Sequence, residues 1–233
     1  MSQLTDALVY FAVFLLSTTL HEAAHAWAAM RGGDLTAYHG GQVSLDPTAH
    51  IKREPFGMVI LPLLTALVTG WPIGYASAPF DPDWARRHPN RAALMALAGP
   101  AANLLLVLVA AAAIHAGMAA NLLHAPDQIS FGHITASRAG RAWDSAGKMI
   151  GAFFSVNLLL MAFNLLPLPP LDGSGALPLV LSPKATRRYQ DFIWSNPVIS
   201  WVGMLIAWRL FDLIFNPIFF GAVRLLYPNM SYH

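Results

Sequence analysis

The sequence predicts an all-α polytopic membrane protein in which three membrane-crossing helices form a core, a re-entrant segment follows the first of them, and at least one further span lies towards the C-terminus. Of the 233 residues, 56% are hydrophobic and only 11% are charged, whereas a soluble domain has about 25% charged residues. Several apolar runs reach the roughly 20 residues that a helix needs to cross a bilayer. We expect residues 1–233 to form a single membrane-embedded domain, with a core at about 4–175 and an interfacial helix and span at about 176–233.

The first apolar run, residues 4–30, carries an HExxH motif formed by His21, Glu22 and His25. Residues four apart lie on one face of a helix, so the two imidazoles can share a metal ion. Glu22 stands where a general base would deprotonate a zinc-bound water. The chain has no cysteine, so a zinc ion would need His, Asp or Glu ligands. The alternative is two histidines satisfied on a polar helix face, but ionisable residues in an apolar span are costly and usually mark a functional site.

The stretch that follows divides into a polar and an apolar part. Residues 31–54 are polar and glycine-rich, which predicts a loop with a short strand or hairpin around 40–45. Residues 56–75 are apolar but are interrupted by Pro62, Gly70 and Pro72. They fit either a full span or a re-entrant segment, because periodicity does not distinguish the two.

Two further runs, 94–114 and 143–166, predict the second and third spans. The second is entered through AGPAAN at 98–103, whose small residues let another backbone approach closely. The third ends in NLLPLPPLDG at 164–173, where three prolines exclude regular helix and put Asp172 on irregular backbone. A hydrolytic zinc site normally has three protein ligands. Asp172 is the best candidate for the third ligand, and an ordinary turn aspartate is the alternative.

The C-terminal part predicts two more helices. Residues 175–194 mix a short apolar piece with charged side chains, which indicates an interfacial helix. Residues 198–215 form a fourth apolar run that contains Arg209 and Asp212. Because these two side chains are three residues apart on one helix, we expect them to partner each other.

Sidedness links the re-entrant segment to the third ligand. Asp172 returns to the side of His21 and His25 only if an even number of crossings separates them, so residues 56–75 must enter and leave on one side. In that arrangement nine Lys and Arg residues lie on the zinc side and four lie opposite, whereas a full crossing splits them seven to six. Excess positive charge marks the cytoplasmic side of a membrane, so we expect the zinc site near the cytosolic face. The nine are Arg31, Lys52, Arg53, Arg86, Arg87, Arg91, Lys184, Arg187 and Arg188, and the four are Arg138, Arg141, Lys148 and Arg224.

The motifs together resemble the site-2 protease family of intramembrane zinc metalloproteases, peptidase family M50. The likeness rests on HEAAH at 21–25, AGPAAN at 98–103 and NLLPLPPLDG at 164–173, which stand in the family's order. It covers the three-span core and is closest to the compact bacterial branch that lacks a PDZ or CBS domain.

The resemblance implies a role for six residues. His21, His25 and Asp172 would hold one Zn²⁺ ion, and Glu22 would be the catalytic acid and base. Asn103 and Asn164 would help to position the substrate near the zinc. A hydrogen bond from Asn103 to a neighbouring span is the alternative role for that side chain.

The expected function is hydrolysis of peptide bonds in or near transmembrane segments of membrane proteins. A substrate helix must unwind first, because its backbone groups are bonded within the helix, and residues 40–45 or 72–76 could offer a strand edge to which it pairs. The alternative is a membrane zinc-binding or transport protein without proteolytic activity, which would favour several carboxylates along a path; the spans have few.

The expected partners are a transmembrane protein or peptide substrate and membrane lipid. No run of Lys and Arg suggests nucleic acid, and the sequence leaves the oligomeric state open. The resemblance and the charge count place the protein in the bacterial inner (plasma) membrane, with the active site toward the cytosol.

Overall fold

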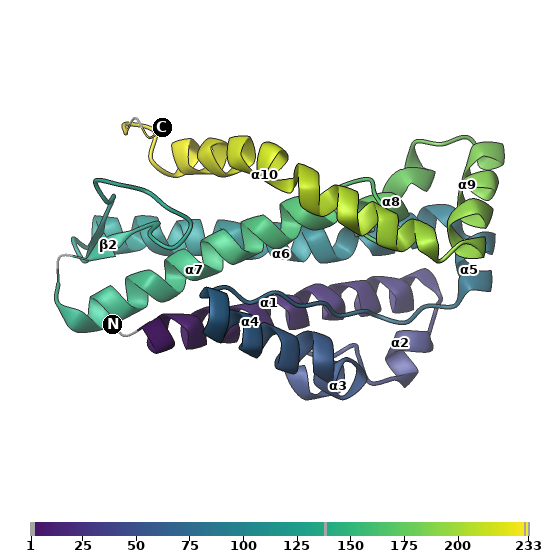
Figure 1. Ribbon diagram of the computed structural model, residues 1–233, viewed down its shortest axis with the longest axis horizontal. Coiled ribbons are helices and arrows are strands. Elements are labelled where there is room, and N and C mark those ends of the chain that lie inside the picture. Colours follow the sequence, from purple (N-terminus) through teal and green to yellow (C-terminus); the bar gives the residue numbers. More distant parts are fainter. Residues whose placement is uncertain (1–2, 138, 231, 233) are drawn as a thin grey trace.

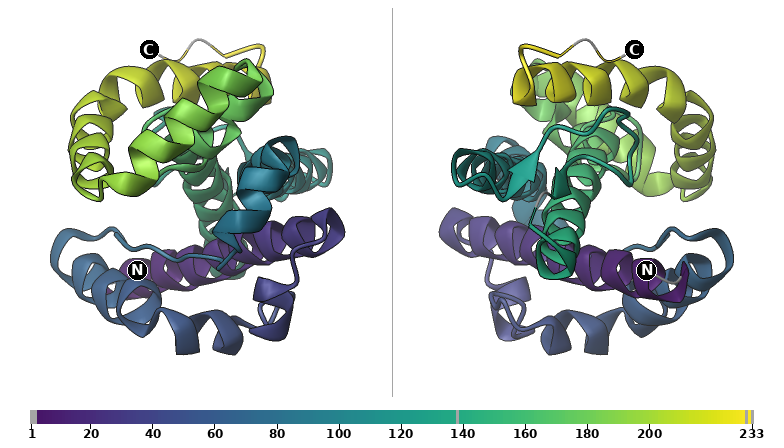
Figure 2. Two further views of the ribbon diagram at one scale, coloured as in Figure 1. Left: turned by 90° about the vertical axis from the view of Figure 1, so that its right-hand side faces the viewer. Right: turned by 90° about the vertical axis from the view of Figure 1, so that its left-hand side faces the viewer.

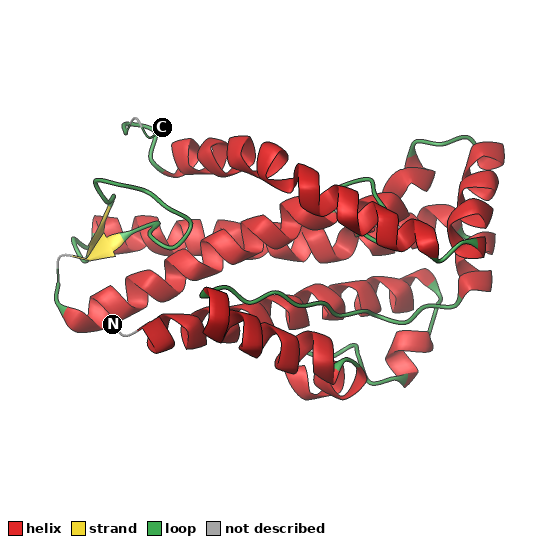
Figure 3. Ribbon diagram, in the orientation of Figure 1, coloured by secondary structure: helices red, strands yellow, loops and turns green. Residues whose placement is uncertain are grey.

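Long helices dominate the computed structural model, which describes residues 3–137, 139–230 and 232 (Figures 1 and 3). Within these residues, four helices are long and apolar enough to cross a membrane: α1 (Gln3–Gly32), α6 (Pro89–Ala119), α7 (Arg141–Asn164) and α10 (Val198–Leu226). The expectation of an all-α protein with three core spans and a fourth is confirmed. Successive long helices run in opposite directions, so both ends of the chain lie at one end of the molecule (Figure 1). Arg138, one of the residues in the charge count, lies outside the described residues.

Shorter elements connect the long helices. The sheet is a single antiparallel pair in which Leu123 is opposite Ser137. It lies at the end of the molecule opposite α5 and α9 (Figure 1). The short elements are α2 (Thr36–His39), α3 (Pro47–Arg53), the π-helical turn η1 (Phe56–Ile60), α4 (Leu61–Thr69), α5 (Pro82–Arg87), β1 (Leu123–His124), β2 (Ala136–Ser137), α8 (Asp172–Ala176), the 3₁₀ turn η2 (Leu177–Leu179) and α9 (Pro183–Ser195).

The segment after α3 enters and leaves at the same end of the bundle, as a re-entrant segment does. Its two helices, η1 and α4, have 5 and 9 residues and together extend about 21 Å, short of the about 30 Å of a bilayer core. The chain then returns in extended form, and the Tyr75 N–H donates to the Gly57 carbonyl at 3.0 Å. At the end of the return, the Asp81 N–H donates to Asp34 Oδ2 at 2.8 Å, just beyond the C-terminus of α1.

The short strand expected around residues 40–45 is wrong. These residues form the turn between α2 and α3. Asp46 is the N-cap of α3 and accepts from the Thr48 N–H at 2.9 Å, and Pro47 suits the first turn of that helix. Just before α2, Asp34 accepts from the Thr36 N–H at 2.9 Å. These aspartate bonds favour short helices rather than strands on both sides of 40–45.

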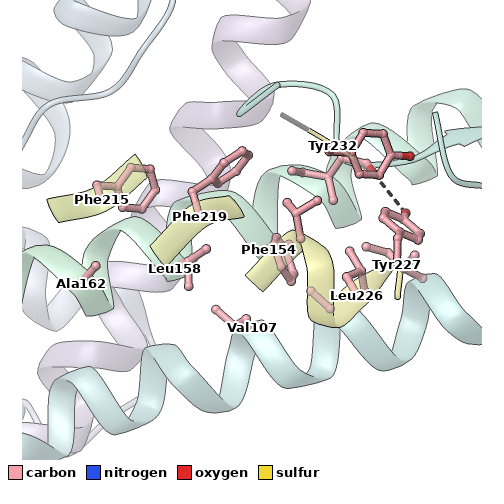
Figure 4. Packing of buried hydrophobic residues seen from close by; sticks show 13 residues of the cluster. Val107, Phe154, Leu158, Ala162, Phe215, Phe219, Leu226, Tyr227 and Tyr232 are labelled. Atoms are coloured by element: carbon pink, nitrogen blue, oxygen red, sulfur yellow. Dashed lines mark hydrogen bonds between the residues drawn. The ribbon is translucent and has the colours of Figure 1, made fainter. Parts of the chain in front are cut away.

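Helix α7 lies at the centre of the bundle, between α10 and α1 in the end-on views of Figure 2, and it also packs along α6. The largest apolar cluster lies where α6, α7 and α10 meet (Figure 4). Tyr227 and Tyr232 close this cluster, and their hydroxyls donate to the carbonyls of Ile134 at 3.0 Å and Pro126 at 2.6 Å. The buried members are Val107, Ala110, Ile114, Ile134, Phe154, Leu158, Ala162, Phe215, Phe219, Val223, Leu226, Tyr227 and Tyr232.

The C-terminus of α1 is fixed against α5 and α6. Gly33 adopts a positive φ of 98° that ends the helix. The Gly32 carbonyl accepts from Trp84 Nε1 at 3.1 Å and from Arg91 Nη1 at 3.2 Å. Both donors satisfy a helix-end carbonyl that lacks an intrahelical partner. This end of α1, which carries the HExxH motif, is therefore held in place by two other elements.

Candidate metal centre

Helix α1 turns His21, Glu22 and His25 into the interior of the bundle. Each of the three is only 5% exposed. The two histidine Nε2 atoms are 2.9 Å apart and the rings meet edge to face. The ligand atoms of all three side chains lie within 4.8 Å of one another, so the group can hold a metal ion. The spacing four residues apart on one helix brings the two imidazoles together, as the motif predicts.

Asp172 comes to the same point from the other end of the chain. Its Oδ2 atom is 3.1 Å from His21 Nε2 and 3.3 Å from His25 Nε2. Ligand atoms about 2.0–2.2 Å from a tetrahedral zinc ion are about 3.3 Å from one another, close to the separations among these three atoms. His21 Nε2, His25 Nε2 and Asp172 Oδ2 therefore form a triangle with the dimensions of a zinc ligand set. Glu22 is also near the histidines but lies beside this triangle.

The backbone around Asp172 differs from the expectation of irregular chain up to Gly173. Residues 165–171 are non-helical, but Asp172 is the first residue of the short helix α8. A Cβ on Gly173 would overlap the carbonyl oxygens of Leu165 and Leu166, so only glycine lets α8 pack on the end of α7. The prolines end α7, and the restart of helix at Asp172 directs its carboxylate back toward α1.

The triangle requires a positive charge at its centre. The Nδ1 atoms of His21 and His25 face the oxygens Asn103 Oδ1 at 2.5 Å and Met95 O at 2.8 Å. Both Nδ1 atoms therefore carry protons, and in the neutral rings both Nε2 atoms present lone pairs. Asp172 Oδ2 is buried without a hydrogen-bond donor. Three lone-pair atoms within 3.3 Å repel one another unless a cation or a proton lies among them, so the donor set fits a metal ion such as zinc.

The electrostatics of Asp172 agree with a carboxylate that faces positive charge. Burial raises the pKa of this carboxyl. Positive charge at the histidine Nε2 atoms, that of His25 foremost, outweighs burial and lowers the pKa of Asp172. A cation among the three atoms, whether a proton or a metal ion, therefore keeps Asp172 ionised.

A buried chain of side chains from three helices fixes the tautomer of His21. Asn157 Nδ2 donates to the Phe153 carbonyl at 2.8 Å and to Ser17 Oγ at 2.9 Å. Asn157 Oδ1 then accepts from Asn103 Nδ2 at 2.8 Å, which leaves Asn103 Oδ1 to face His21. Because the Phe153 carbonyl can only accept, Asn157 must turn its Nδ2 toward that carbonyl and its Oδ1 toward Asn103. The Asn157 Oδ1 in turn requires the Nδ2 of Asn103, so the orientation of both side-chain amides is fixed. Such partners of a ligating histidine orient the ring and set its basicity.

Glycine at position 99 is required by the histidines themselves. A Cβ there would lie 2.5 Å from His21 Nε2 and would also overlap His25 Nε2. The small-residue surface expected at 98–103 therefore exists, and it receives the metal-binding face of α1.

Asn103 and Asn164, which the resemblance implies as substrate-positioning residues, both bond to groups within the bundle. Asn103 is fully buried and both of its amide atoms are bonded, one to His21 and one to Asn157. Asn164 Nδ2 donates to the Leu160 carbonyl in its own helix at 3.0 Å. Among the described residues, neither lines the cleft at the histidines. A role in positioning substrate stays a prediction for Asn164, and the bonding of Asn103 supports the alternative of a hydrogen bond between spans.

A cleft opens from the histidines toward α9. Glu22 and His25 line its floor, the extended residues 76–78 line one wall, and α8 and α9 line the other. Glu22 Oε2 is buried and has no hydrogen-bond partner among the described residues. Tyr189 on α9 donates to the Ser174 carbonyl at 3.2 Å, which holds α9 over the site. The cleft floor therefore places the free carboxylate oxygen of Glu22 beside the two ligand candidates His25 and Asp172.

Comparison with known proteins agrees with this geometry. The sequence profile of peptidase family M50 matches residues 9–204, which is most of the chain. The chain belongs to peptidase family M50. It is accordingly an intramembrane zinc metalloprotease, and its four apolar helices make it an integral membrane protein.

Relatives of this M50 chain carry consistent names. It is 28% identical over 222 residues to YwhC of Bacillus subtilis, named as a candidate zinc metalloprotease, with 88% of this chain and 91% of the relative covered. It is 33% identical over 212 residues to Rip2 of Mycobacterium tuberculosis, named likewise, with 86% of this chain and 71% of the relative covered. Rip2 of Mycolicibacterium smegmatis is 27% identical over 222 residues, with 93% and 71% covered. No solved structure matches the chain.

Sequence reasoning about the M50 motifs missed the supporting residues Ser17 and Asn157. Both are fully buried polar side chains within apolar spans, and that placement is a signal for function. Their partners could not be found from the sequence, because Ser17 and Asn157 are 140 residues apart.

Proposed function

We propose that His21, His25 and Asp172 hold one zinc ion and that Glu22 is the acid and base of peptide-bond hydrolysis. The observation that carries this proposal is the convergence of three ligand atoms from α1 and α8 within 2.9–3.3 Å of one another. Membership of a zinc metalloprotease family supports it. The nearness of Glu22 to the same histidines fits a base that acts beside the metal rather than a ligand.

A bound zinc ion would polarise the scissile carbonyl and lower the pKa of a water molecule to about 7. The free Oε2 of Glu22 would accept the proton of that water and return it to the leaving amine. The Nδ1 bonds of His21 and His25 keep both Nε2 atoms aimed at the metal position. His21, Glu22 and His25 are buried, which strengthens each of these electrostatic interactions.

We propose transmembrane segments of other proteins as the substrates. The extended return at 72–80 supports this, since residues 76–78 and Phe80 line the cleft and, among the described residues, the N–H groups of Gly74 and Ala76 have no hydrogen-bond partner. The N–H groups of Ile73 and Tyr75 bond to Thr65 Oγ1 and the Gly57 carbonyl within the re-entrant segment. Backbone groups alternate in direction along an extended chain, so those of Gly74 and Ala76 point the other way. An unwound substrate can pair with this edge. The turn at 40–45 is not extended, so it does not offer a strand edge for the substrate.

We propose that the site faces the cytosol of a bacterial inner membrane. The re-entrant geometry supports the charge count in which nine basic residues lie on the zinc side and four lie opposite. The core would be residues 4–175, with α9 and α10 added to it as parts of a single domain.

The test uses the purified full chain in lipid nanodiscs with a membrane-protein substrate. Glu22→Gln should retain one zinc ion per chain and lose proteolysis, because the ligands remain and the base is gone. Asp172→Ala should lose both zinc and proteolysis. Zinc retained at full occupancy in Asp172→Ala would identify a different third ligand. Proteolysis retained in Glu22→Gln would remove Glu22 from the chemistry and reopen the zinc-transport alternative.

A further inference from the structure

Helix α10 exposes two opposite charges near its middle. Arg209 and Asp212 are both exposed, in a helix that runs from Val198 to Leu226. In the part of the chain that the structure describes, neither side chain has an ion pair or a hydrogen bond. The expectation that the two partner each other is therefore wrong for the single chain.

The two charges lie on the side of α10 that faces away from the bundle. Its packed side carries buried small and aromatic residues at multiples of four, Gly203, Ala207 and Phe215, of which Gly203 contacts Pro169 closely. The opposite side is exposed, and we term it the charged face of α10. Only 17% of the apolar part of α10 is buried, against 33–56% in the other three long helices. The charged face comprises Leu205, Trp208, Arg209, Asp212 and Asn216.

Lipid cannot satisfy this face. Charged side chains within a span are costly and almost always face a bundle interior, a watery cavity or a partner. Arg209 and Asp212 lie near the midpoint of the 29-residue helix, about 17 Å and 21 Å from Val198 at 1.5 Å per residue. In a span centred on a bilayer core of about 30 Å, both charges therefore lie among the lipid tails.

We propose that the charged face of α10 is the contact between two copies of this chain in the membrane. Two copies share one orientation in the bilayer, so their α10 helices pair in parallel and identical residues lie at equal depth. A two-fold contact is self-complementary: if residue i of one copy meets residue j of the other, then j also meets i. Arg209 of each copy thus faces Asp212 of the other, across an axial offset of about 4.5 Å.

This arrangement fits the observed charges better than other occupants do. Two reciprocal ion pairs replace four unpaired charges, and the face presents one positive and one negative group to its own copy. Asn216, one turn beyond Asp212, adds a side chain of the kind that hydrogen-bonds between membrane helices. A different membrane protein would need the opposite charges in matching order. Pairing of Arg209 with Asp212 inside one helix would still leave both groups facing lipid.

The absence of cysteine from the chain makes a direct test possible. Leu205 on the charged face is 68% exposed, and Leu108 on α6 is 58% exposed on another long helix. Leu205→Cys should form a disulfide-linked dimer under mild oxidation in lipid-diluted liposomes, and Leu108→Cys serves as the matched control. Each polar contact between membrane helices favours association by about threefold, so the two reciprocal ion pairs should give Leu205→Cys an excess of roughly eightfold. Equal cross-linking of the two variants would overturn the proposal.

Charge variants in the Leu205→Cys background separate pairing between copies from pairing within one helix. Asp212→Arg alone and Arg209→Asp alone should each abolish the excess, because like charges then face each other. Co-expression of the two variants with different tags should restore the cross-link between unlike tags. Pairing within one helix predicts no such recovery, so a failed recovery would overturn the proposal.

Neutral variants and single-molecule counting cover the case in which a reversed charge fails to insert. The double variant Arg209→Gln with Asp212→Asn should insert, bind zinc and lose the excess cross-link. An unchanged cross-link in this variant would show that the charges do not make the contact. Single-step photobleaching of the unmodified chain in liposomes should show two copies in each complex. A single copy would overturn the two-copy contact in favour of another membrane protein.

Discussion

Replacement of Asn103 by leucine tests whether the buried amide sets the metal affinity of His21. Asn103 Oδ1 lies 2.5 Å from His21 Nδ1, and the asparagine is fully buried, so water cannot replace the lost acceptor. Partners of a ligating histidine are worth about 10–100-fold in metal affinity, which is about 1.4–2.7 kcal/mol. Asn103→Leu should therefore weaken zinc binding by about one to two orders of magnitude.

The same chain of bonds predicts a smaller effect for Asn157. Polar contacts between membrane helices average about 0.6 kcal/mol, so Asn157→Leu should weaken zinc binding by only about threefold. Because Asn157 reaches His21 through Asn103, the double variant should bind zinc no more weakly than Asn103→Leu alone. Additivity is expected only for independent sites.

Competition with a zinc chelator in detergent, read as the dissociation constant of the metal, measures each variant. Asn164→Leu is the matched control, because its amide bonds within its own helix and its zinc affinity should be unchanged. If Asn103→Leu bound zinc as tightly as the unmodified chain, the tautomer argument would be refuted. Additive losses in the double variant would instead show that Asn157 acts on the site by another route.

Three further predictions concern the site and its substrate. Gly99→Ala should lower zinc affinity sharply, because its Cβ would overlap both Nε2 atoms, whereas Gly221→Ala, which contacts nothing within 4 Å, should not; chelator titration checks both. Removal of zinc should lower the thermal unfolding midpoint. Zinc at 100 times its dissociation constant should raise the free energy of unfolding by about 2.7 kcal/mol, and Asp172→Ala should show no such increase. Ala76→Pro should reduce cleavage of a transmembrane substrate with zinc binding intact, because it removes an N–H on the free edge, whereas Ser77→Pro should act less; equal effects in a cleavage assay would argue against strand pairing.

Several features of this protein were determined by local sequence. The long apolar runs specify α1, α6, α7 and α10, because only a helix satisfies its own backbone groups in a bilayer. The four-residue spacing of His21 and His25 puts their rings on one face without reference to the rest of the chain. The count of basic residues together with the parity of crossings predicts the re-entrant segment. Local sequence misleads at 40–45, where glycines predict a hairpin but the backbone bonds of Asp34 and Asp46 favour short helices on both sides.

Tertiary structure alone decided how the distant pieces meet. Nothing in the spacing of the motifs states that Gly99 touches both imidazoles, that Asn103 bonds to His21, or that Asn157 orients Asn103. Likewise, the exposure of Arg209 and Asp212 depends on which side of α10 packs on its neighbours. The physical reason is one of range. Helix formation and hydropathy act within a few residues, whereas the partner of a buried polar group is set by how separate helices pack, and that packing depends on the whole chain at once.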